Sequence, residues 1–579
     1  MDIKRYLPRQ HYLLDKALYC KIFKPTFSTI KRKSEGCLCT SFKFCYNHNA
    51  LGSSQGYSKQ AHSQKDSLQR MKMFLKEYPD IFADINEKFA MPYINLINVL
   101  QPMTNDNDFY APEPTVSALY NFYASGEIHK PAIDMDYISK NKSEVEENMK
   151  CRKTEIVNLD DVVGLHERIV QIENQINSLK SKKKADDDGQ QCDEKYSKFI
   201  NMSCPPKDTK QLRILSSIFM WLRKELEKQY LLKALGIPNK THYETPILEE
   251  VVLETVGEKP FFDYPVYDHI IIANRLKIMR QQRMANIAGH RNYFLYGAGS
   301  ELEQAIVRFI VERLRKESFT FISAPNIMKD AVFEGSGLVS KKMHTMIYNV
   351  ANYGHGNFCL AGTSEVPLCG FFSSHAISEK ELPLKVCSVS TCYRKETGSR
   401  LDPKGLFRVH QFMKVEMFGL TANETGEESN DLLQEFVSIQ KALYADLDLH
   451  FKVVNMPASD LGLPACRKID IEAWFPGRNK YDEISSASNC TDFQSRRLHI
   501  LYKTNGQYKF THTINATAGA VPRLIVALLE NGQQPNKEVL LPECLHSYMN
   551  GKMKLSKEKC KSLEYIGIDQ SKKKQIKLS

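Results

Sequence analysis

Two stretches in which apolar residues recur at heptad spacing, on either side of a charged segment, constrain the fold of this chain more than any other feature. Steps of three and four residues place these side chains on one narrow stripe of a helix, which is stable in water only when it is covered. The two helices are therefore predicted to pack against each other as an antiparallel hairpin that projects as an arm. The same periodicity is equally compatible with a coiled coil that joins two chains. The stripes consist of Val162, Leu165, Ile169, Ile172, Ile176 and Leu179 in the first stretch and Leu212, Leu215, Phe219, Leu222 and Leu226 in the second.

The domain organisation follows from this hairpin and from the length of 579 residues, which is enough for two or three folded units. Gly236 and Pro238 end the second helix, and the sequence beyond them mixes strand and helix patterns. The runs 497–502 and 507–514 are predicted strands around the hairpin turn Asn505-Gly506, which indicates antiparallel sheet. We therefore predict an α+β protein. Its predicted parts are an unassigned extension at 34–112, the helical arm at 113–235, a large domain at 236–550 and a basic tail at 551–579.

The first 33 residues carry a positive charge that suggests targeting. Between Met1 and Lys33 there are nine Lys or Arg residues and two Asp, mixed with apolar residues but without the uninterrupted apolar core of a secretory signal. This composition is typical of a mitochondrial transit peptide, and a basic tail that binds RNA weakly is the alternative. The formal net charge of +11 permits a polyanionic partner. Apolar runs such as 92–100 have about half of the roughly 20 residues that a membrane helix needs, so no membrane span is expected.

The segment 384–420 contains the residues best suited to chemistry. A strand ends at Tyr393-Arg394-Lys395-Glu396, a loop with Gly and Pro follows, and a second strand begins near Phe407. Side chains alternate along a strand, so one face of the second strand would carry a cation, an aromatic ring and a carboxylate in line. An aminoacyl adenylate would fit along such a face, although a solvated sheet face is an equally good interpretation of this strand alone. The polar face comprises Arg408, His410, Phe412, Lys414 and Glu416, and the core face Phe407, Val409, Met413, Val415 and Met417.

Five separated motifs together resemble a known enzyme family. The segments 393–396 and 407–412 are similar to motif two of class II aminoacyl-tRNA synthetases, and 515–531 is similar to motif three. Pro325, which follows a predicted helix and strand, matches the motif-one proline at the family's dimer interface. Thr363-Ser364-Glu365 and Glu483-Ile484-Ser485-Ser486 resemble the seryl branch, and the run 487–497 is similar to its mitochondrial members. The resemblance implies an antiparallel sheet flanked by helices, preceded by a tRNA-binding helical arm.

The resemblance also implies an activity and a role for each motif residue. A seryl-tRNA synthetase activates L-serine with ATP and Mg²⁺ and transfers it to tRNA(Ser) as a homodimer, here in the mitochondrial matrix. Arg394 would hold the α-phosphate, Glu396 would read adenine, and Phe412 and Arg523 would enclose the base, roles that suit an Arg fork and an aromatic ring. Arg394, Glu483 and Arg523 are the implied catalytic residues, and Glu483 and Ser486 the implied magnesium ligands. The implied ATP-binding residues are Arg394, Lys395, Glu396, Arg408, Phe412, Glu483, Ile484, Ser485, Ser486 and Arg523; the implied serine-binding residues are Thr363, Ser364, Glu365, Glu416, Asn515 and Thr517.

Two departures and two alternatives accompany this resemblance. Ser364 stands where alanine is commoner, and Pro522 precedes the arginine where many members have glycine. One alternative is an inactive relative that keeps the fold for RNA or protein binding, but such relatives are expected to lose ATP or serine ligands that this chain retains. The other is a class II ligase for another amino acid, such as threonine. The fifteen cysteines lack the paired spacing of a structural zinc site, so no zinc is expected and that alternative is disfavoured.

Overall fold

The computed structural model describes residues 117–187, 209–281, 287–338, 346–351, 357–396 and 405–557, all of which belong to one unit of the chain, 68–579. The predicted transit peptide at 1–33, the extension at 34–112 and the end of the basic tail lie outside these residues, as does the side chain of Leu212. Among the described residues, no helix combines the length and the apolar character that crossing a bilayer requires.

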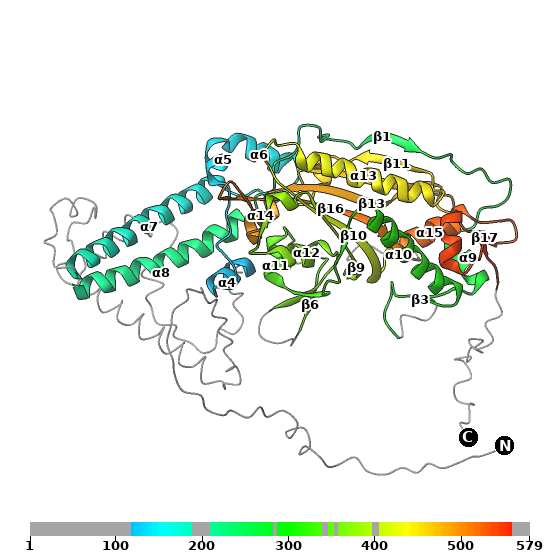
Figure 1. Cartoon of the computed structure of the whole chain (residues 1–579), viewed down its shortest axis with the longest axis horizontal. Coiled ribbons are helices and arrows are strands. Elements are labelled where there is room, and N and C mark those ends of the chain that lie inside the picture. Colours follow the sequence, from blue (N-terminus) through cyan, green and yellow to red (C-terminus); the bar gives the residue numbers. More distant parts are fainter. Residues whose placement is uncertain are drawn as a thin grey trace, which may run out of the picture. The chain divides into compact units, whose positions relative to one another are not determined.

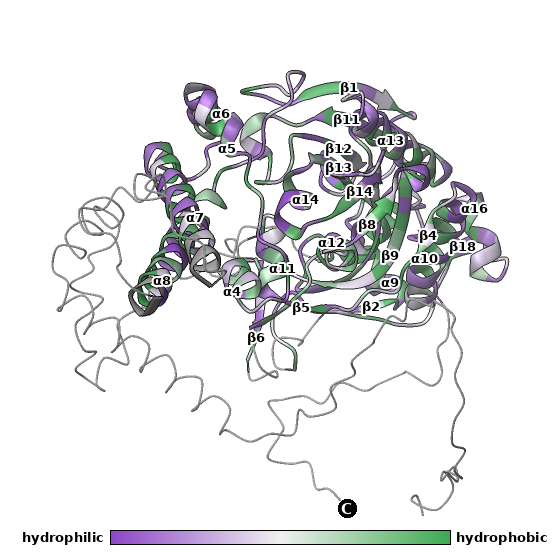
Figure 2. Ribbon diagram, turned by 60° about the vertical axis from the view of Figure 1, so that its left-hand side comes forward, coloured by the Kyte–Doolittle hydropathy of each residue, from purple (hydrophilic) through white to green (hydrophobic). Residues whose placement is uncertain are grey.

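The predicted arm is present as two long antiparallel helices, α7 (Leu159–Asp187) and α8 (Thr209–Ala234) (Figure 1). Every described stripe residue is buried, and each helix shows hydrophobic and hydrophilic bands in Figure 2. The antiparallel direction is visible in the contacts, because Asp161 near the start of α7 forms an ion pair with Lys233 near the end of α8. The stripes therefore pack within one chain, which confirms the hairpin.

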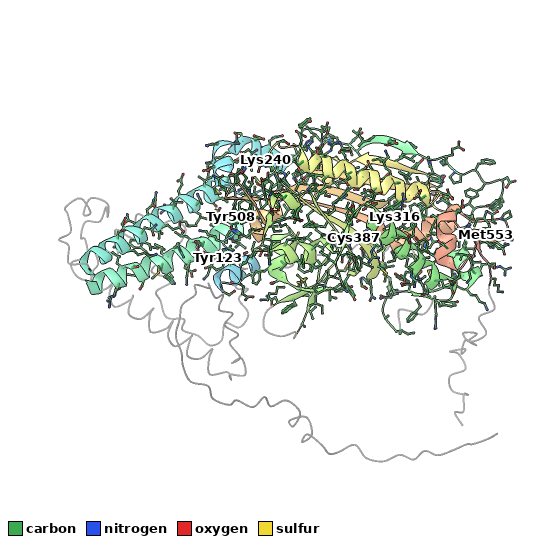
Figure 3. The ribbon with its side chains drawn as sticks, in the orientation of Figure 1. Tyr123, Lys240, Lys316, Cys387, Tyr508 and Met553 are labelled. Atoms are coloured by element: carbon green, nitrogen blue, oxygen red, sulfur yellow. The ribbon has the colours of Figure 1, made fainter. Side chains whose placement is uncertain are left out.

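Three short helices form the base of the arm: α4 (Ala118–Ala124), α5 (Met135–Lys140) and α6 (Lys142–Cys151). Ser117 and Asp134 cap α4 and α5 by accepting the backbone N–H groups of Tyr120 and Tyr137. Lys240, which follows the hairpin and is labelled in Figure 3, lies with its ammonium 3.3 Å from the ring centroid of Tyr137. These contacts attach the arm to the large domain at its base.

The base of the arm and the large domain share one hydrophobic core, which we call the shared core. Leu119, Met149 and the arm stripes belong to the same buried cluster as Phe372 and Phe418 of the large domain. The other members from the large domain are Ile237, Leu368, Cys369, Val386, Leu420, Leu498 and Ile500. The predicted boundary at residue 235 therefore marks the end of a helix but not the edge of a core.

The large domain is built on an eight-stranded sheet with the order β1-β11-β12-β13-β16-β10-β9-β4. Neighbouring strands are antiparallel except for β4 and β9, which are parallel. The strands are β1 (Val251–Val256), β4 (Thr320–Phe321), β9 (Leu384–Tyr393), β10 (Gln411–Thr421), β11 (Phe451–Asn455), β12 (Arg467–Phe475), β13 (Lys480–Thr491) and β16 (His512–Ala520). This arrangement confirms the predicted antiparallel sheet.

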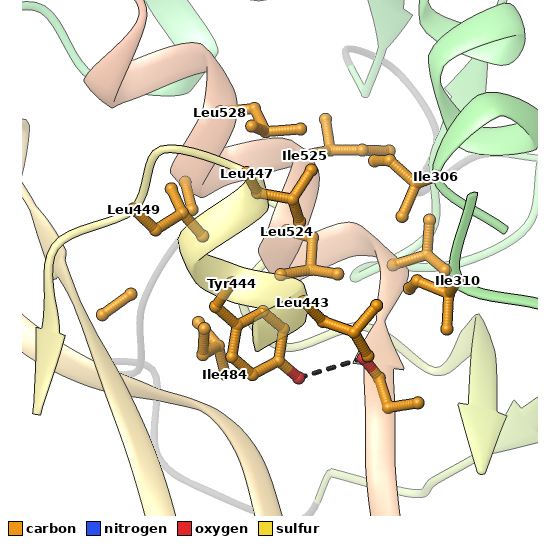
Figure 4. Close-up of a cluster of buried hydrophobic side chains, with 14 of the residues drawn as sticks. Ile306, Ile310, Leu443, Tyr444, Leu447, Leu449, Ile484, Leu524, Ile525 and Leu528 are labelled. Carbon is orange, nitrogen blue, oxygen red and sulfur yellow. Dashed lines mark hydrogen bonds between the residues drawn. The ribbon is translucent and has the colours of Figure 1, made fainter. Parts of the chain in front are cut away.

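Three helices cover one face of this sheet: α10 (Ala298–Lys316), α13 (Glu428–Asp446) and α15 (Val521–Asn531). Their apolar side chains form the main core together with every second residue of the strands, such as Val415 and Met417 of β10 and Ile514 and Ala516 of β16. Figure 4 shows part of this cluster around Tyr444, whose hydroxyl donates to the carbonyl of Ala518 at 3.1 Å. Because one face is filled by helices, the alternate residues of the same strands are left for the opposite face.

Two local expectations need correction. The second strand of the 384–420 segment begins at Gln411, not near Phe407, so Arg408 and His410 precede it. The run predicted as a strand from Arg497 begins instead as helix α14 (Phe493–Leu498), which His499 ends with a left-handed φ of 57°. The strands of the hairpin are β14 (Leu501–Thr504) and β15 (Gln507–Phe510), and Asn505 and Gly506 both have positive φ, as a type I′ turn requires.

The large domain also extends beyond its predicted end at residue 550. Lys554 and Leu555 form strand β18, which pairs with β17 (Val539–Leu540). Leu555 is buried in the main core, so its removal from water keeps this segment attached to the domain. The first residues of the predicted tail are therefore part of the fold.

Candidate active site

The polar face of the sheet forms a pocket, and strand alternation decides which side chains line it. On β10, Phe412, Lys414 and Glu416 line the pocket while Val415 and Met417 pack into the main core. On β16, Asn515 and Thr517 point to the pocket and Ile514, Ala516 and Ala518 to the core. A period of two thus separates ligand-binding candidates from packing residues on neighbouring strands.

A β-bulge on β13 brings the two proposed magnesium ligands to the same face. Glu483 and Ser486 are three residues apart, which would place them on opposite faces of a regular strand. The register against β12 shifts here: Glu472 pairs with Glu483 and Ile471 with Ser485, which leaves Ile484 as an extra residue. Glu483 and Ser486 therefore both line the pocket, while Ile484 and Ala487 pack in the main core, where Ile484 also borders the pocket.

One end of the pocket carries the residues expected to bind ATP. The guanidinium carbon of Arg394 lies 5.3 Å from the ring centroid of Phe412, and its Nε donates to the carbonyl of Gly362 at 3.3 Å. Arg523 donates to the carbonyl of Glu483 at 2.6 Å and to that of Phe407 at 3.3 Å. Two guanidinium groups and a ring are thus held at defined positions on three elements, an arrangement suited to a phosphate and a planar base.

Glu483 is held in its anionic form beside these cations. Burial opposes ionisation, but Arg523, Lys468 and Arg394 together keep the pKa of Glu483 below its ordinary value. Its carboxylate is 3.4 Å from Arg523, and the side chain is 44% exposed, so it remains accessible from the pocket. An anionic carboxylate beside the Ser486 hydroxyl is a hard-oxygen donor pair that fits a magnesium ion.

The other end of the pocket carries the residues expected to bind serine. Glu416 is 2% exposed and forms an ion pair with the ammonium of Lys414. Lys414 also donates to the hydroxyls of Thr363 at 3.0 Å and Thr517 at 3.5 Å. Burial raises the pKa of Glu416, whereas Lys414 and Arg394 act in the opposite direction. Glu416 is thus a buried carboxylate that is paired with a cation of the protein itself.

Glu365 lies in the same region, at the start of α12 (Glu365–Phe372). Its Oε1 accepts hydrogen bonds from Gln494 at 2.6 Å and from Asn515 at 3.1 Å. Burial, and next the negative charge of Glu416, raises the pKa of Glu365 to about 7. The carboxylates of Glu365 and Glu416, the carboxamide of Asn515 and the hydroxyls of Thr363 and Thr517 therefore line the same pocket, where they could pair with an ammonium and a hydroxyl.

Thirteen of the sixteen predicted ATP- and serine-binding residues line this pocket, and three do not. Lys395 is held through its backbone, which donates to the carbonyl of Met346. Arg408 is 45% exposed and forms an ion pair with Glu396 at 3.1 Å, so it contacts a pocket residue from outside. Ser364 is fully buried, and its hydroxyl bonds that of Ser390 at 2.6 Å.

Several residues at the site were not assigned a role from sequence. Lys414 was placed on the correct face, yet its ion pair with Glu416 was not anticipated. Lys468 lines the pocket and bonds Asp470, whose pKa burial raises to about 7. Gln440 is fully buried and donates to the Ser485 hydroxyl at 2.6 Å. A polar residue within the apolar face of a helix, as at Gln440, is the one sequence signal that could have identified such a group.

Comparisons with known proteins place this fold and site in a class. The model of the family described as tRNA synthetase class II core domain (G, H, P, S and T) matches residues 348–532, so the sheet and its pocket are those of a class II aminoacyl-tRNA synthetase. The mitochondrial serine-tRNA ligase of Bos taurus is 38% identical over 476 residues, which cover 79% of this chain and 90% of that protein. The mitochondrial serine-tRNA ligase of Mus musculus is 38% identical over 491 residues, which cover 82% of this chain and 93% of that protein. The chain belongs to the serine-tRNA ligase family.

Solved structures agree with this assignment. Seryl-tRNA synthetase from Pyrococcus horikoshii, complexed with ATP, has a TM-score of 0.64 and 28% identity, covering 74% of this chain and all of that one. The cytoplasmic serine-tRNA ligase of Naegleria fowleri, in complex with AMP, has a TM-score of 0.63 and 29% identity, covering 74% of this chain and all of that one. The family resemblance and the fold class expected from the sequence motifs are thereby confirmed.

Proposed function

We infer that this protein is a serine-tRNA ligase that activates L-serine with ATP and transfers the serine to tRNA. The observation that carries the inference is a single pocket in which Arg394, Phe412 and Arg523 lie at one end and Glu416, Glu365 and Thr517 at the other. Strand β10 joins the two ends, because Phe412 and Glu416 are four residues apart on one face, or about 13 Å at roughly 3.3 Å per residue. This separation suits an adenylate that extends from its base to its amino group.

The proposed mechanism requires positioning and charge stabilisation. The carboxylate of serine attacks the α-phosphorus of ATP, pyrophosphate leaves, and a ribose hydroxyl of the tRNA then attacks the carbonyl carbon of the adenylate and releases AMP. Arg394 would contact the α-phosphate, whose charge grows in the transition state, and Glu416 would bind the ammonium of serine. Thr517 and Asn515 would contact the hydroxyl and the carboxylate. Buried partners of the hydroxyl would be left unpaired by alanine, a penalty that can reach about 10⁴-fold.

A magnesium ion bound together with ATP is the proposed metal, held by Glu483 and Ser486. In the part of the chain that the structure describes, no group of three or more His, Cys, Asp or Glu side chains is arranged to hold a metal ion by itself. Magnesium is usually held by one or two protein oxygens together with substrate phosphates, which suits this pair. The ion would supply positive charge to the phosphates.

The proposed macromolecular partners are tRNA(Ser) and a second copy of this chain. The hairpin of α7 and α8 would contact the tRNA body, a role supported by membership of the family and by the absence of proposed small-molecule ligands from the arm. The dimer contact is proposed around Pro325, which is exposed beyond strand β4. Phe321 of that strand is 41% exposed, which is consistent with apolar surface available for an interface.

The proposed function is tested by serine-dependent exchange between ATP and pyrophosphate, measured for the wild type and for Glu416→Gln. The wild type is expected to respond to serine far more strongly than to alanine or threonine. The variant removes the anionic partner of the substrate ammonium at nearly constant volume, so the KM for serine should rise by about 10 to 10²-fold while the KM for ATP changes little. A loss confined to ATP binding would show that the orientation of the adenylate along β10 is reversed.

We further propose that the protein acts in the mitochondrial matrix, because the relatives from Bos taurus and Mus musculus are mitochondrial enzymes and the first 33 residues are basic. Fusing residues 1–33 to a fluorescent reporter should direct the reporter to the matrix, and replacing the nine Lys and Arg residues of this segment by Gln should leave it in the cytosol. A cytosolic location of the unchanged fusion would refute this localisation without affecting the proposed activity.

A further inference from the structure

Gln494 of helix α14 is a fully buried carboxamide beneath the serine end of the pocket. Its Nε2 donates to Oε1 of Glu365 at 2.6 Å and to the carbonyl of Ser336 at 3.2 Å. Its Oε1 accepts from the hydroxyl of Thr513 at 2.7 Å and from the thiol of Cys369 at 3.4 Å. Both hydrogens and both lone pairs of this amide are thus used, and the amide has one favourable orientation. A flipped amide would place its oxygen against the carboxylate.

Helix α14 is fixed at several points, so this amide has little freedom to move. Leu498 packs in the shared core, and the guanidinium of Arg497 donates to the carbonyl of Ile237 at 3.4 Å. The backbone N–H of Ala132, at the base of the arm, donates to the carbonyl of Arg496 at 2.8 Å. Packing and backbone contacts on either side of Gln494 therefore define where its Nε2 lies.

Glu365 is a carboxylate whose charge state depends on its neighbours. The charged groups that act on it are Glu416, which disfavours the anion, and Lys414 and Arg394, which favour it. Burial raises the pKa of the thiols of Cys369 and Cys490, and the nearby carboxylate of Glu365 raises both further. Burial dominates and raises the pKa of Glu365 to about 7, and the hydrogen bond from Gln494 is the largest contribution in the opposite direction. Because the pKa of Glu365 lies near neutral pH, the hydrogen bond from Gln494 affects what fraction of this carboxyl group is ionised.

We propose that Gln494 is a positioning residue that orients the carboxylate of Glu365 for the recognition of serine. This inference rests on the proposed function, since it assigns to Glu365 a contact with the ammonium or hydroxyl of the substrate. Gln494 itself lies behind Glu365 and does not line the pocket. Its effect on the substrate is therefore transmitted through Glu365, and serine, not ATP, is the substrate affected.

The test is Gln494→Met, which removes the amide at similar volume, in the serine-dependent exchange assay. Loss of a hydrogen bond to a charged group should lower kcat/KM for serine by about 10 to 10²-fold, with the KM for ATP little changed. The pH profile supplies the specific readout. Removing a donor destabilises the anion, raises the pKa of Glu365, and therefore shifts the acid limb of kcat/KM for serine to higher pH.

Two further variants separate positioning from general structural damage. Cys369→Ala removes only a weak thiol hydrogen bond to Oε1 of Gln494 and retains the donor to Glu365, so its acid limb should move much less than that of Gln494→Met. Thr513→Val keeps Gln494 but removes the hydroxyl that fixes its amide. The acid limb should therefore shift to higher pH, by less than in Gln494→Met. This variant also tests the proposal if Gln494→Met does not fold. In a Glu365→Gln background, Gln494→Met should cause little additional loss.

Each outcome decides the proposal. An unshifted acid limb in Gln494→Met and Thr513→Val, or the same shift in Cys369→Ala, would overturn it. Full additivity with Glu365→Gln would also overturn it, because the two residues would then act independently. If the wild type showed no serine-dependent exchange, the proposed function itself would fail, and this result is distinguishable because it does not depend on any variant.

Discussion

Replacing Arg394 by alanine should slow serine-dependent exchange between ATP and pyrophosphate by about 10² to 10³-fold or more, by analogy with removing one donor that stabilises transition-state charge. Arg394 follows the end of β9, and its guanidinium is held by the carbonyl of Gly362 and the ring of Phe412. This position is maintained by protein contacts, so little reorganisation is needed when the α-phosphate gains charge. Most of the loss should therefore appear in kcat.

A matched pair of variants makes this result specific. Arg394→Lys keeps the charge but not the planar fork, and should recover only part of the activity. Lys385→Ala, at the opposite end of the same strand, removes a cation whose partner is Glu435 and should leave exchange near the wild-type rate. If Arg394→Ala raised the KM for ATP with kcat unchanged, Arg394 would bind the ground state and transition state equally, contrary to its proposed role.

Shortening the arm should abolish efficient charging of tRNA while leaving adenylate formation largely intact. We propose replacing residues 177–218 by a short Gly/Ser linker, which retains the base of the hairpin and the part of the shared core that packs against the large domain. Every proposed ligand of serine and ATP lies beyond Gly362, so exchange should persist. Contacts to a polyanion are electrostatic and distributed, and losing many of them together should reduce charging by about 10²-fold or more and make the remainder more sensitive to salt.

Two measurements check the interpretation of this deletion. The oligomeric state should be unchanged, because the proposed dimer contact around Pro325 is remote in sequence from the deleted segment. Heat-induced unfolding should remain cooperative, which would show that the shared core is intact. A shortened protein that charges tRNA at the full rate would refute the role of the arm in tRNA binding, and the hairpin would then be a purely structural element.

Periodic features of the sequence predicted most of the fold and most of the pocket. The stripe from Val162 to Leu226 predicted the hairpin, and alternation along 412–417 separated pocket residues from core residues correctly. Motif residues such as Arg394, Glu416 and Thr517 were predicted to act together and do line one pocket. The roles assigned to them individually stay predictions.

The features that sequence reasoning missed depend on tertiary contacts. The bulge at Ile484 has no local signature, yet it decides that Glu483 and Ser486 share a face. Lys414 and Glu416 are two residues apart on one face of β10, so strand alternation explains why they are close but did not predict their ion pair. Gln494 and Glu365 are far apart in the sequence, and only the fold brings them together. The strand predicted from Arg497 was wrong because its apolar residues, such as Leu498, also fit a short helix.

The shared core has a consequence for exchanging arms between members of the family. A graft made at Gly236, where the second arm helix ends, would divide a single set of packed side chains between two parents. Met149 and Leu119 of one parent would then meet Phe372 and Phe418 of the other, and core positions tolerate such unmatched volumes poorly. A junction placed within the hairpin, between Ile172 and Leu222, would keep this packing from one parent and transfer only the distal helices, so the exchangeable module is smaller than the arm itself.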